Sequence, residues 1–435
     1  GRAAGPAMRS LFAVAYDQVI GTLTQAGPRA PIRFTYEAEY QGGLPLSTLM
    51  PVAAGRFTGR VVEAFIEGLL PEDPGTRARW GRELDVASDD SMALLSQMGW
   101  DAPGAVQFCA PEDLETIRAR GSELRRLTED DIAARIRDLR TRDAASWTLP
   151  DEHWSLAGQQ SKFALTRTSA GWHEAHGSAA TTHIIKPGIG RLHHQALIEH
   201  AAMRAASTLG IDVAHTEFVR FGDEEAAIVI ERYDRILRPD DSVLRIHQED
   251  FCSATGRLPT QKYEADRGPG MADLMRVATR NATDLQVAAQ AIGDFVAFNY
   301  VAGAPDGHAK NISMLLTPTT VEVAPLYDLA TSLPYDGSGL TREVAIAVGG
   351  RRKFGQVLGR HWDRAASILR IPSEEYRRRA REMADGFPDA FTDALRAVGT
   401  PDAAEVRIRS TDAIAAHVQV VRSRLDDAPT KRSLA

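Results

Sequence analysis

Hydrophobic and polar positions follow two different periods along the chain, and the change of period predicts where strands give way to helices. Apolar and β-branched runs between residues 11 and 36, at 182–187 and at 226–230 are typical of short strands bounded by turns. Beyond Gly270, apolar residues recur every three to four positions, which is typical of amphipathic helices. The pattern therefore predicts a β-rich first half and a second half dominated by helices.

A heavily charged stretch at 112–142 interrupts this pattern. Within it, Thr128 and Asp131 have the spacing of a capping box, and Ile132 and Ile136 follow at helical spacing. A charge run of this kind is usually the solvated face of a helix. We therefore predict a surface helix that bridges two domains.

Composition and charge argue against several classes of protein. The 435 residues carry a net charge of −7 at pH 7, which argues against non-specific nucleic-acid binding by the chain alone. Cys109 and Cys252 lie in unrelated contexts, so neither a disulfide framework nor a cysteine zinc site is predicted. No apolar run approaches the length of a membrane span, and no signal peptide is visible. We therefore expect a cytoplasmic chain that works away from membranes.

The best candidate for chemistry is the polar segment 304–311, in which Asp306 precedes Asn311 by five residues. This is the spacing of a kinase catalytic loop, where the aspartate orients the attacking hydroxyl and the asparagine holds a metal ion. The spacing alone would also fit an ordinary polar loop.

The sequence after this loop adds a geometric argument. Apolar, β-branched runs at 312–316 and 321–325 flank a short turn, which predicts a hairpin. Because a hairpin returns its second end beside its first, Asp328 should lie near Asn311. Two carboxylates and an amide would then converge as oxygen ligands for a hard divalent cation. A surface turn after a polar loop is the alternative interpretation.

Two further segments could bind the phosphates of a nucleotide. Ala157 and Gly158 belong to a small, polar loop that leads into a strand, so its backbone N–H groups could wrap phosphates. An ordinary turn would have the same composition. Lys186 ends a strand-like run, and a strand lysine in kinases contacts nucleotide phosphates. Glu199, on the helix that follows, is the natural ion-pair partner of Lys186, although a solvated glutamate would look the same.

The run 226–230 turns polar at Glu231 and Tyr233, where the hinge of a two-lobed kinase would lie. Backbone groups near these two residues could bind adenine, or the segment could be an ordinary strand end.

Taken in order, these motifs resemble the HipA family of bacterial serine/threonine-kinase toxins. The resemblance rests on segments 155–162, 181–186, 231–235, 247–250, 262–264, 268–270, 306–311 and 325–328. The segments 44–51, 70–71 and 103–106 also resemble the small N-terminal subdomain of that family. The resemblance covers nearly the whole chain from Met8.

The resemblance implies an α+β, two-lobed protein-kinase-like fold. A mixed, β-rich N-lobe would carry an extra small N-terminal subdomain, and helices would dominate the C-lobe. We expect residues 1–7, before Met8, to be a cloning remnant. The expected parts of the rest are the N-terminal subdomain (8–110), a charged helical connector (111–150), the N-lobe with its phosphate loop (151–240) and the C-lobe with the catalytic loop (241–435).

The resemblance also implies ATP- and Mg²⁺-dependent phosphorylation of a protein serine or threonine. Asp306 would be the catalytic base, and Asn311 and Asp328 would bind Mg²⁺. The implied ATP-binding residues are Lys186, Glu231, Tyr233, Ala157, Gly158 and Lys310, with Glu199 paired to Lys186.

Ser155 matches the loop serine that the family autophosphorylates, and Ser161 is a second candidate in the same loop. A phosphate there adds roughly two negative charges at neutral pH. It should repel the phosphates of ATP and expel the loop, which would make the modification a self-inactivation switch.

As a family member, the chain would be a toxin that stops translation and growth, giving persistence, by phosphorylating an aminoacyl-tRNA synthetase. A small HipB-like DNA-binding antitoxin would neutralise it and would supply most contacts with operator DNA. Two alternatives remain: a kinase of the same fold that acts on another protein or a small molecule, and a non-enzymatic co-repressor that binds the antitoxin. The intact Asp306, Asn311, Asp328 and Lys186 favour an enzyme. A metal-dependent hydrolase is a distant third, since no ligand cluster supports it.

Overall fold

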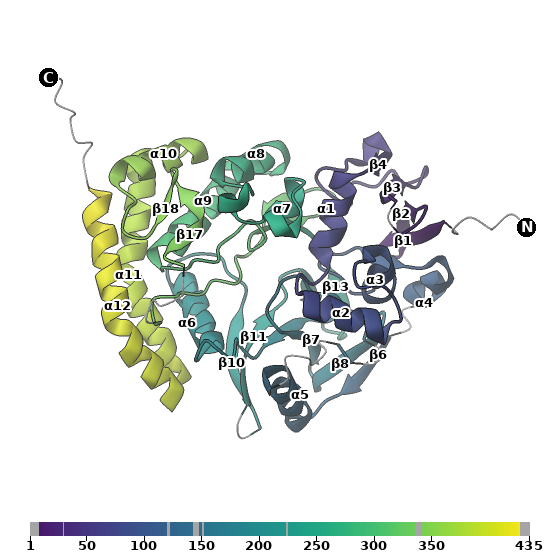
Figure 1. Cartoon of the computed structure of the whole chain (residues 1–435), viewed down its shortest axis with the longest axis horizontal. Coiled ribbons are helices and arrows are strands. Elements are labelled where there is room, and N and C mark those ends of the chain that lie inside the picture. The colour runs from purple at the N-terminus through teal and green to yellow at the C-terminus, as the bar shows by residue number, and fades with distance from the viewer. Residues whose placement is uncertain are drawn as a thin grey trace, which may run out of the picture. The chain divides into compact units, whose positions relative to one another are not determined.

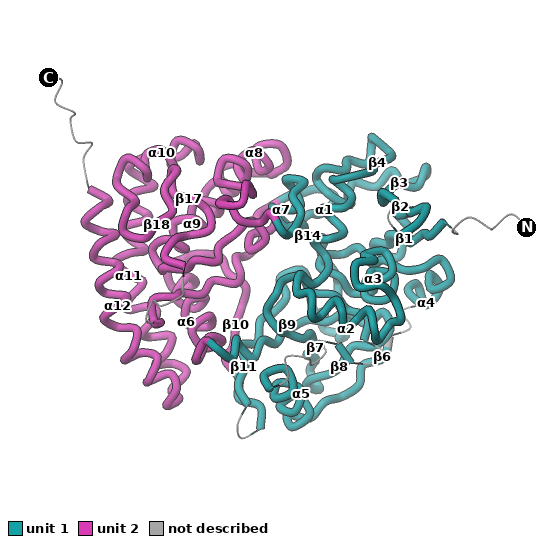
Figure 2. Tube along the Cα trace, viewed as in Figure 1, with its two compact units in different colours: residues 1–191, 219–260, 314–321 teal, residues 192–218, 261–313, 322–435 magenta. Residues whose placement is uncertain are grey.

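The computed structural model forms two compact units, which Figure 2 colours separately. It describes residues 8–28, 30–119, 122–141, 148–149, 152–222, 225–335 and 341–426. Unit 1 comprises Gly1–Arg191, Val219–Thr260 and Met314–Val321, and unit 2 comprises Leu192–Phe218, Gln261–Ser313 and Glu322–Ala435. Both units therefore combine segments that lie far apart in the sequence.

Unit 1 opens with a five-stranded antiparallel sheet in the order β4-β3-β2-β1-β5 (Figure 1). Phe65 of helix α1 approaches Phe108 of β5, with ring centroids 6.5 Å apart, so helix and sheet share an apolar interior. The strands predicted between residues 11 and 36 are confirmed. The elements of this part are β1 (Arg9–Ala15), β2 (Gln18–Gln25), β3 (Arg33–Tyr36), η1 (Val52–Ala54), β4 (Arg56–Thr58), α1 (Arg60–Leu69), α2 (Pro74–Glu83), α3 (Ser91–Met98) and β5 (Gln107–Cys109).

A six-stranded sheet in the order β10-β11-β9-β7-β8-β6 follows (Figure 1). Ile132 and Ile136 of helix α5 pack with Phe163, Ile185 and Val229 of the sheet in one buried cluster. The elements are β6 (Ser122–Arg126), α5 (Glu129–Thr141), β7 (Phe163–Thr168), β8 (Gly171–Gly177), β9 (His183–Lys186), β10 (Thr216–Phe221) and β11 (Glu225–Glu231). Strands β9 and β11 confirm the strands predicted at 182–187 and 226–230.

The charged segment at 112–142 is not one continuous helix, which corrects our expectation of a wholly helical connector. Its described residues form η2 (Pro111–Asp113), α4 (Leu114–Arg118), strand β6 and helix α5. Within the described part of the chain, β6 pairs with β8 alone and is an edge strand, a position that tolerates charged side chains well. The capping box is confirmed, because Thr128 N donates to Asp131 Oδ2 (2.9 Å) and Asp131 N donates to Thr128 Oγ1 (3.2 Å).

Short strands lie between the larger elements. β15 (Ser313–Leu316) and β16 (Val321–Val323) are neighbours in a three-stranded sheet, which confirms the predicted hairpin. The remaining short elements are β12 (Arg235–Leu237), β13 (Val243–Arg245), β14 (His247–Asp250), α7 (Phe251–Ala254), η3 (Pro259–Gln261), η4 (Glu264–Asp266), β17 (Glu343–Val348) and β18 (Arg351–Lys353).

Helices dominate unit 2, and α9 is its centre. From Ile292 to Val301 every residue of α9 is buried. Its Phe298 packs edge-on against Phe387 of α11, and its Tyr300 packs likewise against Trp362 of α10. The helices are α6 (Gln195–Thr208), α8 (Met271–Asn281), α9 (Leu285–Val301), α10 (Gly359–Leu369), α11 (Ser373–Val398) and α12 (Pro401–Leu425). Among the described residues, no helix combines the length and apolar character needed to cross a bilayer.

Candidate active site

The candidate catalytic loop begins where α9 ends and is held close to that helix. The Ala304 N–H donates to the Asn299 carbonyl (2.8 Å). A Cβ atom added at Gly307 would come within 2.5 Å of the Asn299 side chain, so only a glycine fits there without displacing that side chain. The buried helix therefore fixes the position from which Asp306 projects.

Asp306 presents an accessible carboxylate, since its side chain is 61% exposed. The Tyr263 hydroxyl donates to Asp306 Oδ1 (2.5 Å), which holds one carboxylate oxygen. A short hydrogen bond to an ionised acceptor is among the stronger kinds. Asp306 is thus oriented by a side chain from a segment more than forty positions earlier, while remaining open to an approaching hydroxyl.

Asn311 lies against Asp306 and is only 5% exposed. Its Nδ2 donates to the Asp306 carbonyl (2.8 Å), and this bond defines which way the amide points. Because the nitrogen is committed to the loop, Oδ1 is the atom that can act as a metal ligand. Mg²⁺ in kinases is held by only one or two protein oxygens together with substrate phosphates. This donor set fits Mg²⁺.

Asp328 follows the β15–β16 hairpin and has a left-handed backbone, with φ +60°. The neighbouring Tyr327 donates its hydroxyl to the Lys310 carbonyl (2.7 Å) and also hydrogen-bonds to Ser313 Oγ (2.6 Å). These bonds tie residue 327 to the residue that precedes Asn311. The end of the hairpin thus returns to the catalytic loop, as the sequence argument requires.

Positive charge is concentrated around this loop. Lys262 and Lys310 are each only 7% exposed. Burial, and then the charge of Lys262, lower the pKa of His308 to about 3, so its imidazole is neutral near pH 7. His308 Nε2 therefore approaches Asp306 Oδ1 (3.8 Å) without forming an ion pair. Two lysines beside exposed and half-buried carboxylates suit a polyphosphate that brings its own metal ion.

In unit 1, the candidate phosphate loop is compact and its serine is hidden. Ser155 is fully buried, and its Oγ donates to the Leu69 carbonyl (2.7 Å). Gly158 has φ +106°, and a Cβ there would come within 2.7 Å of Lys162 Nζ. That Nζ donates to the Ala157 carbonyl (2.7 Å) and closes the loop on itself. Ser161, the second candidate, is half-buried.

The other predicted nucleotide residues of unit 1 lie at or just beyond the ends of one pair of strands, β9 and β11. Lys186 ends β9 and is 5% exposed, and it pairs with Ile228 in the neighbouring β11. Glu231 ends β11 and is exposed. Tyr233 follows it and is half-buried, with its hydroxyl bonded to Gln248 Oε1.

Arg232, Asp234 and Arg235, which neighbour Tyr233 in the sequence, belong to a buried ionic network. Arg232 and Arg235 both reach Asp101, at 3.3 Å and 3.0 Å, and both pair with Asp234. Burial acts to raise the pKa of Asp101, but the charges of Arg235, Arg245 and Arg232 outweigh it and hold that pKa well below its usual range. Asp101 is therefore an ionised, fully buried anchor.

The structure assembles the predicted residues in two groups. Unit 2 holds one group, which is Asp306, Lys310, Asn311, Asp328 and Glu199. Unit 1 holds the other, which is Ser155, Ala157, Gly158, Ser161, Lys186, Glu231 and Tyr233. Lys186 and its expected partner Glu199 thus belong to different units.

Sequence reasoning missed the roles of Tyr263, Lys262 and His308. The first two lie in the segment 262–264, which contributed to the family resemblance without any assigned function. Their contact with the catalytic loop spans more than forty residues, and no spacing rule connects them to Asp306. His308 stands inside the loop itself, but its burial and neutral state cannot be seen from sequence.

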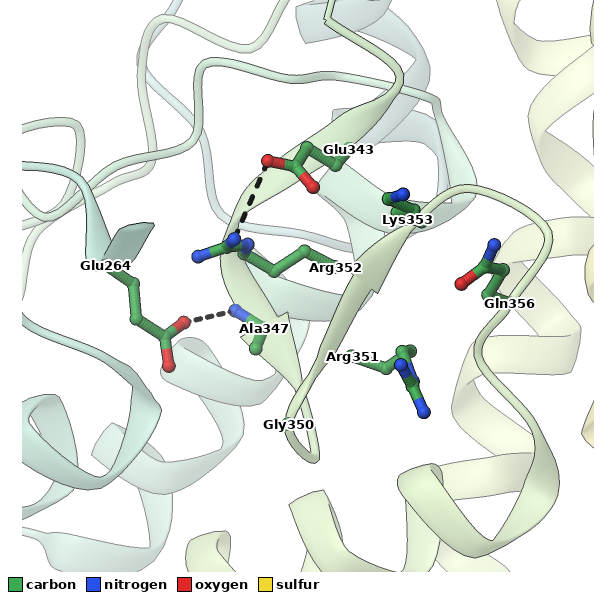
Figure 3. A pocket seen from close by; sticks show the side chains of 8 residues that line it. All are labelled: Glu264, Glu343, Ala347, Gly350, Arg351, Arg352, Lys353 and Gln356. Carbon is green, nitrogen blue, oxygen red and sulfur yellow. Dashed lines mark hydrogen bonds and ion pairs between the residues drawn. The ribbon is translucent and has the colours of Figure 1, made fainter. Parts of the chain in front are cut away.

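A cavity of about 380 Å³ lies beside Glu264, the neighbour of Tyr263 (Figure 3). Glu264 accepts a hydrogen bond from Ala347 N (2.6 Å), and Arg352 lies 3.7 Å from Glu343. The lining residues are Glu264, Glu343, Ala347, Gly350, Arg351, Arg352, Lys353 and Gln356. The β17–β18 hairpin thus contributes three basic side chains to a hollow in the same unit as Asp306.

Comparisons with known proteins match most of the chain. Residues 154–391 match the model of the HipA-like C-terminal domain, and residues 11–109 match that of the HipA N-terminal domain. The Y4mE protein of Sinorhizobium fredii is 33% identical over 415 residues, covering 93% of this chain and 96% of that protein. The serine/threonine-protein kinase toxin HipA of Shewanella oneidensis is 30% identical over 350 residues, covering 76% of this chain and 77% of the toxin. A solved complex of Shewanella oneidensis HipA, HipB and operator DNA matches with a TM-score of 0.79 and 25% identity, covering 96% of this chain and 100% of that one.

Proposed function

Because the chain belongs to the HipA family of serine/threonine-protein kinase toxins, we propose that it transfers the γ-phosphate of ATP to a serine or threonine of a target protein. The chain is an enzyme of the serine/threonine-kinase class and has a mixed α+β, two-lobed kinase-like fold. The observation that carries the proposal is the exposed Asp306 carboxylate, held by Tyr263 beside Asn311.

Asp306 is the proposed catalytic base. Its oriented carboxylate would accept a hydrogen bond from the attacking hydroxyl and take its proton as the phosphoryl group is transferred. Asn311 Oδ1 and Asp328 would hold Mg²⁺, which neutralises charge on the transferring phosphates. Lys310, buried beside them, would add positive charge at the same place. Positioning and charge neutralisation account for most of the rate of phosphoryl transfer, and these residues supply both.

Nucleotide binding falls mainly to unit 1. Lys186 would contact the phosphates, and the backbone of Ala157 and Gly158 would wrap them. Glu231 and Tyr233 would border adenine. The outward placement of Glu231 and the inward placement of Arg232 support this division of roles.

Ser155 is the proposed autophosphorylation site, with Ser161 as the second candidate. Because Ser155 is fully buried and its Oγ is bonded to Leu69, the loop must leave this position before the hydroxyl can react. A phosphate would carry about two charges into a site that bonds only one neutral hydroxyl, so the loop could not return. This supports a modification that switches the kinase off.

We further propose that the chain is a cytoplasmic toxin that inhibits translation and growth. Its target would be an aminoacyl-tRNA synthetase, and a HipB-like antitoxin would neutralise it and carry it to operator DNA. The support is the matching relative, whose solved complex contains HipA, HipB and operator DNA. The parts expected at 8–110, 111–150, 151–240 and 241–435 remain our proposed division of the chain.

The test compares the variant Asp306→Asn with the control variant Asp393→Asn, which changes an exposed aspartate on α11. We expect Asp306→Asn to lower phosphoryl transfer by about 10²–10⁴-fold while ATP still binds, because the lysines and most metal contacts remain. Transfer is followed with labelled ATP on a cell lysate and on purified aminoacyl-tRNA synthetases, and ATP binding by calorimetry. Substantial phosphoryl transfer by Asp306→Asn would overturn the assignment of Asp306 as the base. Labelling of other proteins, with none of the aminoacyl-tRNA synthetases labelled, would overturn the proposed target.

A further inference from the structure

We infer that the N-terminal part of unit 1 acts as a clamp that holds the phosphate loop in its docked position. The clamp consists of two segments, 69–72 and 97–101, which contact residues 153–158 through hydrogen bonds and one stacked ring pair. The inference deepens the proposed function, because it rests on the loop 155–162 binding phosphates. It assigns a positioning role to residues that lie before the kinase motifs in the sequence.

The first segment of the clamp, 69–72, lies along the loop from Ser155 to Gly158. Ser155 Oγ donates to the Leu69 carbonyl (2.7 Å). Pro71 pairs with Gly158 through a parallel bridge, and the Glu72 N–H donates to the Gly158 carbonyl (3.0 Å). This segment links α1 to α2, so its backbone is fixed at both ends by helices. The loop is thereby attached to a rigid edge.

The second segment, 97–101, holds the residues just before and at Ser155. Asp101 pairs with Trp154 through another parallel bridge, in which Asp101 N donates to the His153 carbonyl (3.3 Å) and Ser155 N donates to the Asp101 carbonyl (3.2 Å). Trp100 stacks on the His153 ring at 4.4 Å. The His153 ring also hydrogen-bonds through Nδ1 to the Gln97 carbonyl (2.8 Å). Both sides of the loop are therefore bonded to the N-terminal part.

Asp101 connects this clamp to the strand end that would border adenine. Its carboxylate accepts from Thr181 N (2.9 Å) and pairs with Arg232 and Arg235, while its backbone bonds the loop. A shift of Asp101 would therefore move the phosphate loop and the segment 231–235 together. Asp101 is a positioning residue for both parts of the nucleotide site.

The clamp predicts that release of Ser155 is controlled by contacts outside the loop. Every clamp bond that is lost should raise the fraction of molecules whose loop is undocked. One neutral hydrogen bond corresponds to about a fivefold change in such an equilibrium. Weakening segment 69–72 should therefore expose Ser155 although no residue of the loop has changed.

The experiment compares Glu72→Pro with Glu72→Ala. Proline removes the N–H that bonds Gly158, whereas alanine keeps that N–H and removes the same side chain. Pro71 lies in an extended bridge, which is the conformation that a following proline requires. Amide hydrogen exchange is measured over residues 153–158 without nucleotide. Because both variants lack the same side chain, we expect exchange to be about fivefold faster in Glu72→Pro than in Glu72→Ala.

A second variant covers the case in which Glu72→Pro does not fold. His153→Phe keeps the ring over Trp100 but cannot bond the Gln97 carbonyl, and it should also accelerate exchange over 153–158. Wild-type exchange rates in the folded variants would show that the loop holds itself and would overturn the clamp.

A separate readout distinguishes the clamp from the proposed function. Asp306→Asn chains with and without Glu72→Pro serve as acceptors for the wild-type kinase and Mg-ATP, and phosphate at Ser155 is followed by mass spectrometry. Faster labelling with Glu72→Pro, by about fivefold, supports both ideas. Faster exchange without any Ser155 phosphate supports the clamp and overturns the assignment of Ser155. Unchanged exchange overturns the clamp whatever the labelling shows.

Discussion

The catalytic loop of unit 2 and the phosphate loop of unit 1 are held in opposite ways. The catalytic loop continues a buried helix, and the carboxylate it carries is exposed. The phosphate loop is bonded to segments from a separate part of the chain, and the serine it carries is completely buried. The catalytic loop keeps the Asp306 carboxylate accessible, whereas the phosphate loop keeps the Ser155 hydroxyl buried until its contacts are released.

The difference follows from where the supporting bonds come from. Asn311 and Asn299, which shape the catalytic loop, lie within a few residues of Asp306, and Tyr263 adds one bond from a distant segment. Leu69 and Asp101, which hold Ser155, lie 86 and 54 positions away from it. The catalytic loop thus depends largely on the helix that it continues, whereas the position of the phosphate loop depends on a separate part of the fold.

The largest expected effect is on stability and concerns Asp101, the residue that anchors the phosphate loop. Asp101→Asn would remove the carboxylate that Arg232, Arg235 and Arg245 share, and Asp234 would remain as a partner of Arg232 and Arg235. We expect a loss of roughly 3–5 kcal/mol in the free energy of unfolding, measured by urea denaturation. The exposed Asp89→Asn is the control. If the two variants were equally stable, the ionic network around Asp101 would not be an anchor of the phosphate loop.

The same anchor has a defined pH dependence. Because the pKa of Asp101 is lowered in the folded state, its contribution to stability is present above the ordinary pKa of an aspartate. It is lost as the pH falls below that value. In Asp101→Asn this part of the acid sensitivity should be absent.

A second effect on stability concerns Glu249, which holds the segment 47–48 of the N-terminal part. Its carboxylate accepts bonds from Ser47 Oγ (2.5 Å) and Thr48 N (2.8 Å), but burial raises its pKa to about 7. The folded state therefore binds a proton between about pH 4.5 and 7 that the unfolded state releases. Stability should fall by about 3 kcal/mol as the pH rises through this window. Denaturation of Glu249→Gln across the same range should lack this slope, and an identical slope would contradict the assignment.

A smaller effect is expected in the catalytic loop. Tyr263→Phe removes the bond to Asp306 Oδ1 and leaves the helix and metal ligands in place. We expect kcat to fall roughly tenfold with little change in the KM for ATP, since a hydrogen bond to a charged group is being lost. Tyr335→Phe, which removes a hydroxyl elsewhere in unit 2, serves as the control. A fall in ATP affinity instead of kcat would place Tyr263 in nucleotide binding.

The last prediction is that His308 of the catalytic loop has no effect on the pH profile of kcat. With its pKa lowered to about 3, His308 stays neutral across the range in which kinases are assayed. The pH profile of kcat should therefore contain no step from an imidazole. A step near pH 6.5 that disappears in His308→Asn would contradict this.

Sequence reasoning reached further in the catalytic loop than in the phosphate loop, for a physical reason. The spacing of Asp306 and Asn311 and the β15–β16 hairpin are local features, so periodicity and turn chemistry predict them. Strands β9 and β11 were found in the same way. The charged connector misled us, because an edge strand and a solvated helix face carry similar charge.

Contacts between distant segments could not be derived from sequence. Nothing in the residues around Ser155 indicates that its hydroxyl donates a hydrogen bond to the Leu69 carbonyl, or that its N–H donates to the Asp101 carbonyl. The same holds for Tyr263, whose bond to Asp306 depends on how the segments of unit 2 fold together. These bonds are created by tertiary packing, and only the structure shows them.

The most direct test of the account is the intact mass of the purified chain before and after incubation with Mg-ATP, with Asp306→Asn beside it. The account predicts that the wild type gains one phosphate, located at Ser155, and that the variant gains none. Phosphate gained equally by the variant, or found elsewhere with Ser155 unmodified, would contradict the account.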